Sequence, residues 1–174
     1  MTLKVTDGIP MQGHLCVITR DAKTGKQLKR IEIRNKIMFL AADVLVELIA
    51  QRASDPAPAT GRIYSMRMGT ASTAATRADT NLGAYVIGKV LADVDKVTGV
   101  PGELQFSATL EAADANGSTL QEAGLFTAGG TPSTSDAPLT PPGSTRMFAR
   151  QIHPSFPKTI AITVEYQWRI AFTA

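Results

Sequence analysis

Hydrophobic and polar residues alternate without a break near the end of the chain, from residue 160 to residue 172. A period of two places successive side chains on opposite faces of an extended backbone, so this segment is predicted to be a β-strand. At about 3.3 Å per residue it would be roughly 40 Å long, which suits the centre of a curved sheet. We expect much of the core to come from its large side chains, namely Tyr166, Trp168, Ile170 and Phe172.

Shorter runs of the same kind predict strands earlier in the chain. Residues 14–34 read as a β-hairpin whose two apolar runs are joined by a turn ending at Gly25. A short strand is expected over residues 63–68. Residues 85–94 are apolar on both alternating faces, which is typical of a strand buried on both sides.

A second hairpin is predicted around Asn116-Gly117. The strand before it alternates and places Phe106 and Leu110 in the core, and the strand after it ends at Phe126, also assigned to the core. Asn-Gly favours the type I′ turn, because both residues readily take positive φ. The pattern therefore predicts that these two strands pair directly with each other.

One segment has helical rather than strand periodicity. After Asn35, a plausible N-cap, apolar residues recur at intervals of three and four, with Asp43 and Glu47 on the other side. This predicts one amphipathic α-helix over about residues 36–51, ended by the proline-containing stretch that follows. The longest apolar run, residues 37–50, is interrupted by these two acids and is shorter than the ~20 residues of a membrane span, so no membrane association is expected.

The predicted fold class is mainly β: an antiparallel β-sandwich with this one helix and long loops rich in Pro, Ser and Thr. The chain has 174 residues and a mass of 18.5 kDa, which suits a single domain over residues 1–174. Residues 127–145 are rich in Pro, Gly, Ser and Thr and lack apolar periodicity. They are interpreted as a projecting arm or loop that orders against a neighbouring subunit, with plain disorder as the alternative.

Charge and composition narrow the classes of partner. Charged residues make up 19% of the chain, below the usual ~25%, so the surface must rely on small and neutral residues, as interfaces often do. The net charge is only +3, and the basic residues of the first hairpin have no aromatic neighbours on which bases could stack, so nucleic-acid binding is not favoured. The single Cys16 excludes an internal disulfide.

Few residues could carry chemistry. His14 and His153 are the only histidines, and no metal-binding spacing occurs, so no metal, cofactor or small-molecule substrate is expected. Glu122 stands among apolar residues in a predicted strand and must be paired if it is buried; Arg150 and Lys158 are the candidate partners. An enzyme would have to use His153, Glu122 and Asp79, and the sequence favours the structural ion pair over catalysis.

Several short motifs occur in an order that resembles a known group of proteins. They are the Gly69-Thr70 pair after a strand, the Asp79-Thr-Asn-Leu segment, a strand with Phe106-Ser-Ala-Thr-Leu, the Asn116-Gly turn, Glu122-Ala-Gly-Leu-Phe, Met-Phe-Ala-Arg150, and Phe156-Pro-Lys-Thr before the terminal strand. This series resembles tailed-bacteriophage virion proteins, in particular the virion-anchoring N-terminal modules of tail or collar fibres and small stand-alone neck, tail or decoration proteins. The Phe-Pro-Lys spacing is tighter than in that group, and the loop at 127–145 is long. Because the printed sequence contains no shaft, we do not expect the protein to be a receptor-binding fibre itself.

The resemblance implies a structural protein of the virion that assembles in multiple copies at the neck or collar, the tail or the baseplate. A capsid decoration protein is an alternative within the same class. A particle-associated enzyme and a weak nucleic-acid-binding protein are alternatives of other classes. The expected partners are copies of itself and other phage virion proteins, and the expected location is the virion, after synthesis in the cytoplasm of the host bacterium.

Overall fold

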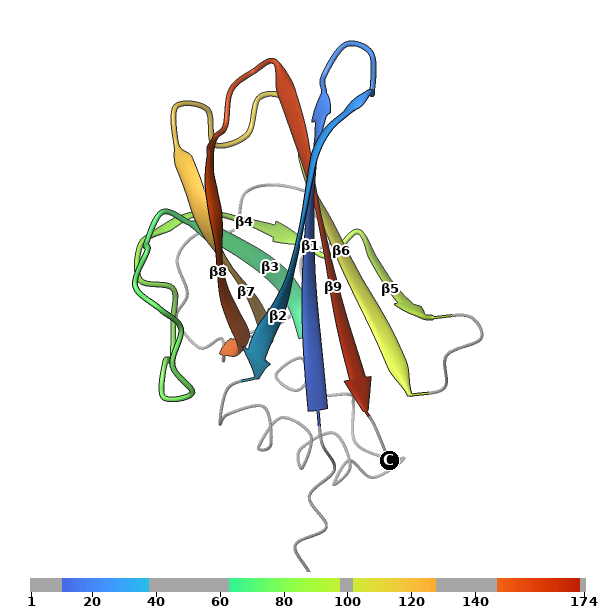
Figure 1. The fold of residues 1–174 in the computed structure, drawn as a ribbon, viewed down its shortest axis with the longest axis vertical. Helices are drawn as coiled ribbons and strands as arrows, with labels where there is room; N and C mark the ends of the chain where they lie inside the picture. Colours follow the sequence, from blue (N-terminus) through green and yellow to red (C-terminus); the bar gives the residue numbers. More distant parts are fainter. Residues whose placement is uncertain (1–10, 38–62, 98–101, 128–146, 173–174) are drawn as a thin grey trace, which may run out of the picture.

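The computed structural model describes residues 11–37, 63–97, 102–127 and 147–172 (Figure 1). Within these ranges the regular secondary structure is β-strand throughout, as the alternating patterns predict. The nine strands are β1 (Met11–Asp21), β2 (Gln27–Ile37), β3 (Ile63–Gly69), β4 (Tyr85–Val90), β5 (Asp93–Lys96), β6 (Glu103–Leu110), β7 (Thr119–Thr127), β8 (Met147–Pro157) and β9 (Ile162–Phe172).

The strands form two antiparallel sheets that are joined at one corner (Figure 1). The first sheet has the order β2-β1-β9-β6-β5 and the second has the order β8-β7-β3-β4. The corner is β2, whose last residues Lys36 and Ile37 pair with Arg150 and Ala149 of β8. At the opposite side the chain passes directly from β4 in the second sheet to β5 in the first.

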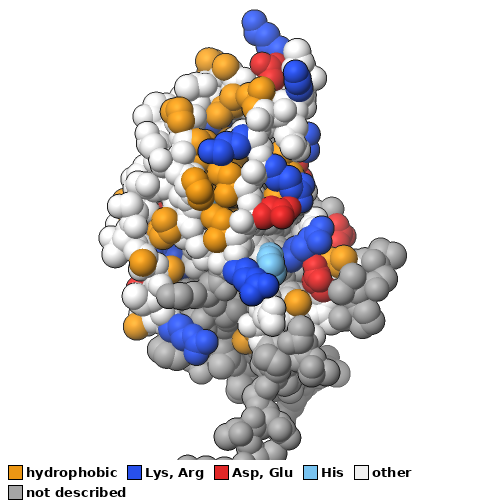
Figure 2. All heavy atoms as spheres, viewed as in Figure 1, with side chains coloured by type: hydrophobic (Ala, Val, Ile, Leu, Met, Phe, Trp, Pro, Cys, Tyr) orange, Lys and Arg blue, Asp and Glu red, His pale blue; other side chains and the backbone are white. Residues whose placement is uncertain are grey.

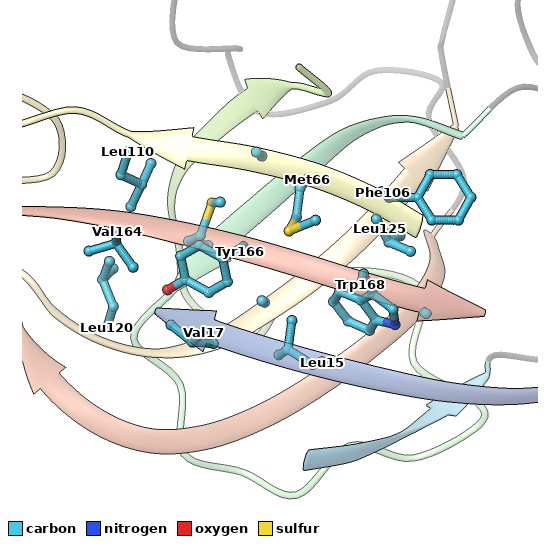
Figure 3. Packing of buried hydrophobic residues seen from close by; sticks show 14 of the residues in the cluster. Leu15, Val17, Met66, Phe106, Leu110, Leu120, Leu125, Val164, Tyr166 and Trp168 are labelled. Atoms are coloured by element: carbon cyan, nitrogen blue, oxygen red, sulfur yellow. The ribbon is translucent and has the colours of Figure 1, made fainter. Parts of the chain in front are cut away.

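The two sheets share one hydrophobic cluster (Figure 3). Leu15 and Val17 of β1 meet Met66 of β3 and Leu125 of β7 in this cluster, and all four side chains are fully buried. The facing sides of the sheets are therefore the apolar sides predicted from the alternation. The opposite sides carry the polar residues. The second sheet differs in part, because Phe126 lies on its outer side and packs with Leu82 and Met147 in a small separate cluster.

β9 has the central position in the first sheet that its long alternation predicts. It pairs with β1 on one side and with β6 on the other. Trp168 and Tyr166 are fully buried in the shared cluster, whereas Phe172 is only partly buried at its border. The strand begins at Ile162, and Ile160 is 71% exposed, so the predicted start was two residues too early. The remaining residues assigned to the core are all buried: Phe106, Leu110, Phe126 and Ile170.

The helix prediction is wrong at its first two residues. Lys36 and Ile37 continue β2 in extended conformation. Their backbone groups pair with β8 in this conformation, and a helix that began after an N-cap at Asn35 would lose this pairing. The rest of the predicted helix, residues 38–51, lies outside the described residues, as does the predicted arm except for Thr127, which ends β7.

Two predictions of strand connectivity are also corrected. The turn at 114–117 does not join a hairpin: β6 pairs with β9 in the first sheet, while β7 pairs with β3 and β8 in the second. Positive φ occurs at Ala115 and Gly117, with values of 50° and 84°, so the turn is not the Asn-Gly type I′ turn. The run over 85–94 is likewise divided between β4 and β5, and Val94 is half exposed at 50%. In both places the chain changes sheet, which local turn chemistry does not encode.

Candidate functional site

A fully buried carboxylate lies on the outer side of the second sheet. Glu122 belongs to β7, pairs with Gly69 of β3 and is 0% exposed. Its Oε1 accepts hydrogen bonds from the backbone N–H groups of Ala71 at 3.2 Å and Ala84 at 2.8 Å, and its Oε2 accepts one from Gly83 at 3.0 Å. These donors belong to the two ends of the segment that joins β3 to β4. The carboxylate therefore holds both ends of this connection against the sheet.

Arg150 supplies the positive charge that balances Glu122. It lies on β8, next to β7, and its Nε and Nη2 approach Oε2 of Glu122 at 2.9 and 2.8 Å. Its Nη1 contacts Oδ2 of Asp79 at 2.6 Å, and Nη2 also donates to the carbonyl oxygen of Thr73 at 3.2 Å. The guanidinium is thus bound by two carboxylates and one carbonyl, which compensates for a side chain only 4% exposed.

Asp79 connects this pair to the middle of the β3–β4 connection. Its carboxylate accepts hydrogen bonds from the backbone N–H of Thr76 at 2.9 Å and from the Thr76 hydroxyl at 2.6 Å. Partial burial acts to raise the pKa of Asp79, but the hydrogen bonds from Thr76 and Arg150 together lower it below its usual value. Asp79 is therefore ionised at neutral pH, so two negative charges face one guanidinium.

Two glycines allow the connection to lie this close to the sheet. A Cβ at Gly69 would collide with the carbonyl oxygen of Ala84 and with the Glu122 carboxylate. A Cβ at Gly83 would lie 2.7 Å from that of Ala71. Gln121 also holds the β3–β4 connection against the sheet, because its Nε2 donates a hydrogen bond to the Thr70 carbonyl at 2.6 Å. We name the set of Asp79, Glu122 and Arg150 the buried ion network.

The structure separates the other residues singled out in the sequence from this network. Lys158, the alternative partner of Glu122, is buried near the turn after β6, where its Nζ donates to the carbonyl oxygens of Ala112 and Thr159, both at 3.1 Å. Burial lowers the pKa of Lys158, and the nearby acids Asp114 and Glu111 oppose this shift. Glu122 is therefore paired with Arg150 and not with Lys158.

His153 points into the core rather than towards the network. Its ring stacks on Phe156, with centroids 5.5 Å apart, and Nε2 lies 3.4 Å from the Tyr166 hydroxyl. Burial lowers the pKa of His153, so the ring is neutral at pH 7. Of the three residues that an enzyme would need, Glu122 and Asp79 converge on Arg150, and His153 is enclosed elsewhere.

Cys16 lies on the outer face of the first sheet, in a groove with a volume of about 250 Å³. The groove is lined by charges of both signs, including Arg30, Glu32 and Arg169. Burial raises the pKa of the Cys16 thiol, which leaves it protonated and a weak nucleophile at neutral pH.

Arg67 is a residue that the sequence reasoning did not single out. It lies on β3 and is 3% exposed, and its guanidinium carbon is 4.3 Å from the centroid of the Phe126 ring. Its Nε and Nη1 are buried and have no hydrogen-bond partner in the structure, and the same is true of Oγ of Ser65, two residues earlier. The signal available in the sequence was an arginine flanked by methionines inside a predicted strand.

Neither a metal-binding cluster nor a helix able to cross a membrane is found in the part of the chain that the structure describes. No group of three or more His, Cys, Asp or Glu residues there is arranged to hold a metal ion, and no helix there has the length and hydropathy needed to cross a membrane. Comparison of the chain with protein-family models, curated proteins and solved structures finds no match.

Proposed function

We propose that the protein is a structural component of a tailed-bacteriophage virion, present in multiple copies at the neck or collar, the tail or the baseplate. One observation carries the proposal: four of the motifs that resemble this group meet at one place in the fold. These motifs are scattered over the sequence, yet those of Asp79, Glu122 and Arg150 supply the buried ion network, and Gly69 lies directly against Glu122.

The network is suited to a mechanical role. A buried carboxylate that accepts three backbone hydrogen bonds and an ion pair fixes a loop rigidly, because each of these groups would be left unsatisfied if the loop moved. We propose that the two sheets form a β-sandwich and that the network keeps its β3–β4 connection in one shape. A building block repeated in an assembly needs such invariant surfaces, since every contact is made many times.

The surface also supports an assembly role more than binding to nucleic acid. On the face shown in Figure 2, Lys and Arg side chains lie as separate groups among acidic and neutral residues, and hydrophobic side chains gather between β2 and β8. A continuous basic stripe with stacking aromatics would be expected of a nucleic-acid binder. An apolar area edged by charges is typical of contacts between proteins.

The alternative of a particle-associated enzyme finds less support in the geometry. Every oxygen of Glu122 is engaged by donors, and the lowered pKa of His153 accompanies full enclosure in the core. A general acid or base needs to reach a substrate proton, which neither side chain can do in this arrangement.

Immunogold electron microscopy of tailed phage particles from the organism that encodes this chain tests the proposal. An antibody raised against the purified chain is expected to label one site, at the neck, tail or baseplate, on each particle. Labelling distributed over the capsid shell would instead support the decoration-protein alternative. Absence of both label and peptide from purified particles, as checked by mass spectrometry, would overturn the proposal.

A further inference from the structure

Two buried side chains on the outer face of β3 carry hydrogen-bond donors that have no acceptor. Met66 and Met68 of this strand point into the shared core, so Ser65 and Arg67 point to the opposite side of the second sheet. Ser65 is 1% exposed and Arg67 is 3% exposed. The Ser65 hydroxyl and two of the three guanidinium nitrogens lack partners. Buried polar groups are normally hydrogen-bonded, so a cluster of unsatisfied donors requires an explanation.

Arg67 cannot avoid this cost by losing its proton. Burial lowers the pKa of its guanidinium, but arginine remains charged in proteins because its intrinsic pKa is so high. The Phe126 ring contacts one flat side of the group and offers a cation–π interaction, but it accepts no conventional hydrogen bond. An isolated buried cation in such surroundings is strongly unfavourable unless an anion joins it.

Arg150, on the same face of the sheet, is a buried arginine whose charge is balanced by carboxylates. Gly124 of β7 pairs with Arg67 on one side and with Arg150 on the other, so the two arginines are neighbours across one strand. Arg150 binds Glu122 and Asp79, which are thereby already engaged. No carboxylate in the described part of the chain lies within ion-pair distance of Arg67. The described residues therefore leave the charge of Arg67 without a balancing anion.

We propose that Ser65 and Arg67 form a binding site for a single carboxylate group carried by another protein chain. One guanidinium balances one negative charge, which matches an Asp or Glu side chain or a chain terminus; a phosphate would bring more charge than the site can neutralise. The Ser65 hydroxyl adds a donor that a carboxylate oxygen can accept. The near-complete burial of both side chains also favours a slender group over a flat surface.

The apolar surroundings add selectivity. Phe126 packs with Leu82 and Met147 in a small hydrophobic cluster separate from the main core, and Tyr85 packs against it. A carboxylate entering this environment gains a stronger interaction than it would in water, because the local dielectric constant is lower. The site therefore binds an acid attached to an apolar stem better than a fully hydrated anion. This inference does not depend on the proposed function.

Sodium propionate, which reproduces the end of a glutamate side chain, tests the site. The melting temperature of the wild-type protein is expected to rise with propionate in the millimolar range, following mass action, relative to sodium chloride of equal ionic strength. Arg67→Met should abolish this increase, and Ser65→Ala should weaken propionate binding several-fold. Arg30→Met, at an exposed arginine that pairs with Glu32, is the matched control and should retain the full effect.

The stability of the unliganded variants gives an independent readout. Because no described residue balances the charge of Arg67, Arg67→Met is expected to be at least as stable as the wild type without propionate. Equal melting curves of wild type and Arg67→Met at every propionate concentration would overturn the proposal. So would a loss of stability in Arg67→Met as large as that caused by breaking the Glu122–Arg150 pair, or a stronger response to sulfate than to propionate. Should Arg67→Met fail to fold, the Ser65→Ala titration decides alone.

Discussion

Replacing Glu122 by alanine would remove the group on which the β3–β4 connection depends. The change leaves the backbone N–H groups of Ala71, Gly83 and Ala84 without an acceptor, and it leaves Arg150 with Asp79 as its remaining carboxylate partner. The folded protein can respond only by admitting water or by moving the connection away from the sheet. Both responses lower the free energy of unfolding.

The size of the loss follows from the burial of the pair. Breaking a buried ion pair by removing one partner costs about 3–5 kcal/mol, and Glu122 is 0% exposed, so solvent screening does not reduce this figure. The unsatisfied N–H groups are part of the same perturbation and are not added separately. Since domains are stable by about 5–15 kcal/mol, Glu122→Ala is expected to lose a large fraction of the total.

The fluorescence of Trp168 can be used to measure the free energy of unfolding of each variant. This residue is the only tryptophan and is fully buried between the sheets, so its fluorescence in a urea titration reports global unfolding. Glu32→Ala is the control, because Glu32 is 63% exposed and its pairing with Arg30 is worth at most about 1 kcal/mol. A free energy of unfolding for Glu122→Ala within about 1 kcal/mol of the wild type would refute the structural role assigned to this carboxylate.

Glu122→Gln separates charge from shape. Glutamine has nearly the same volume and keeps one acceptor oxygen, but it provides no negative charge for Arg150 and places an amide donor among donors. We expect a loss of about 1–3 kcal/mol, smaller than that of Glu122→Ala. A glutamine variant as stable as the wild type would show that the charge contributes nothing, and the ion pair would then be incidental to the hydrogen bonds.

Two further outcomes follow from the structure. Burial lowers the pKa of His153 in the folded protein, whereas a histidine in the unfolded chain has its ordinary pKa of about 6.5. Stability should therefore decrease as the pH is lowered through about 6.5, because the unfolded state then binds a proton that the folded state does not. His153→Phe should flatten this dependence in urea titrations. Gly69→Ala should destabilise the protein by about 1–3 kcal/mol in the same assay, since the new methyl group collides with the Ala84 carbonyl and with Glu122. At Gly25 nothing lies within 4 Å, so Gly25→Ala should show only the backbone cost of its positive φ, and equal losses at both glycines would contradict the steric argument.

The parts of the fold that follow from local patterns could be predicted from the sequence. The alternation around Trp168 encodes a strand with one buried face, and the same rule places Phe106 and Leu110 in the core. The apolar neighbours of Glu122 indicated a buried acid that must be paired, and Arg150 was one of two candidates. These inferences need only the periodicity of a strand and the cost of burying a charge.

The parts that depend on pairing between distant segments could not be predicted in this way. Asp79 joins Arg150 across 71 positions, and nothing near Asp79 in the sequence specifies that contact. The Asn116-Gly117 turn predicts a reversal of the chain but not which strands will pair, and here the chain crosses to the other sheet. Lys36 and Ile37 show the same limit, since the pairing with β8 that makes them extended is invisible in a helical pattern.

The contrast between Arg150 and Arg67 links stability to binding on one face of the second sheet. Both arginines are nearly fully buried, and the same residue of β7, Gly124, pairs with both. Arg150 is satisfied by acids of its own chain, so it stabilises the isolated protein. Among the described residues Arg67 has an aromatic ring but no acid beside it, so in the site proposed above its cost is recovered when another chain supplies a carboxylate. A protein stabilised by a partner in this way would be driven towards assembly by mass action, and the network of Asp79, Glu122 and Arg150 beside Arg67 would hold the proposed site in place before the partner binds.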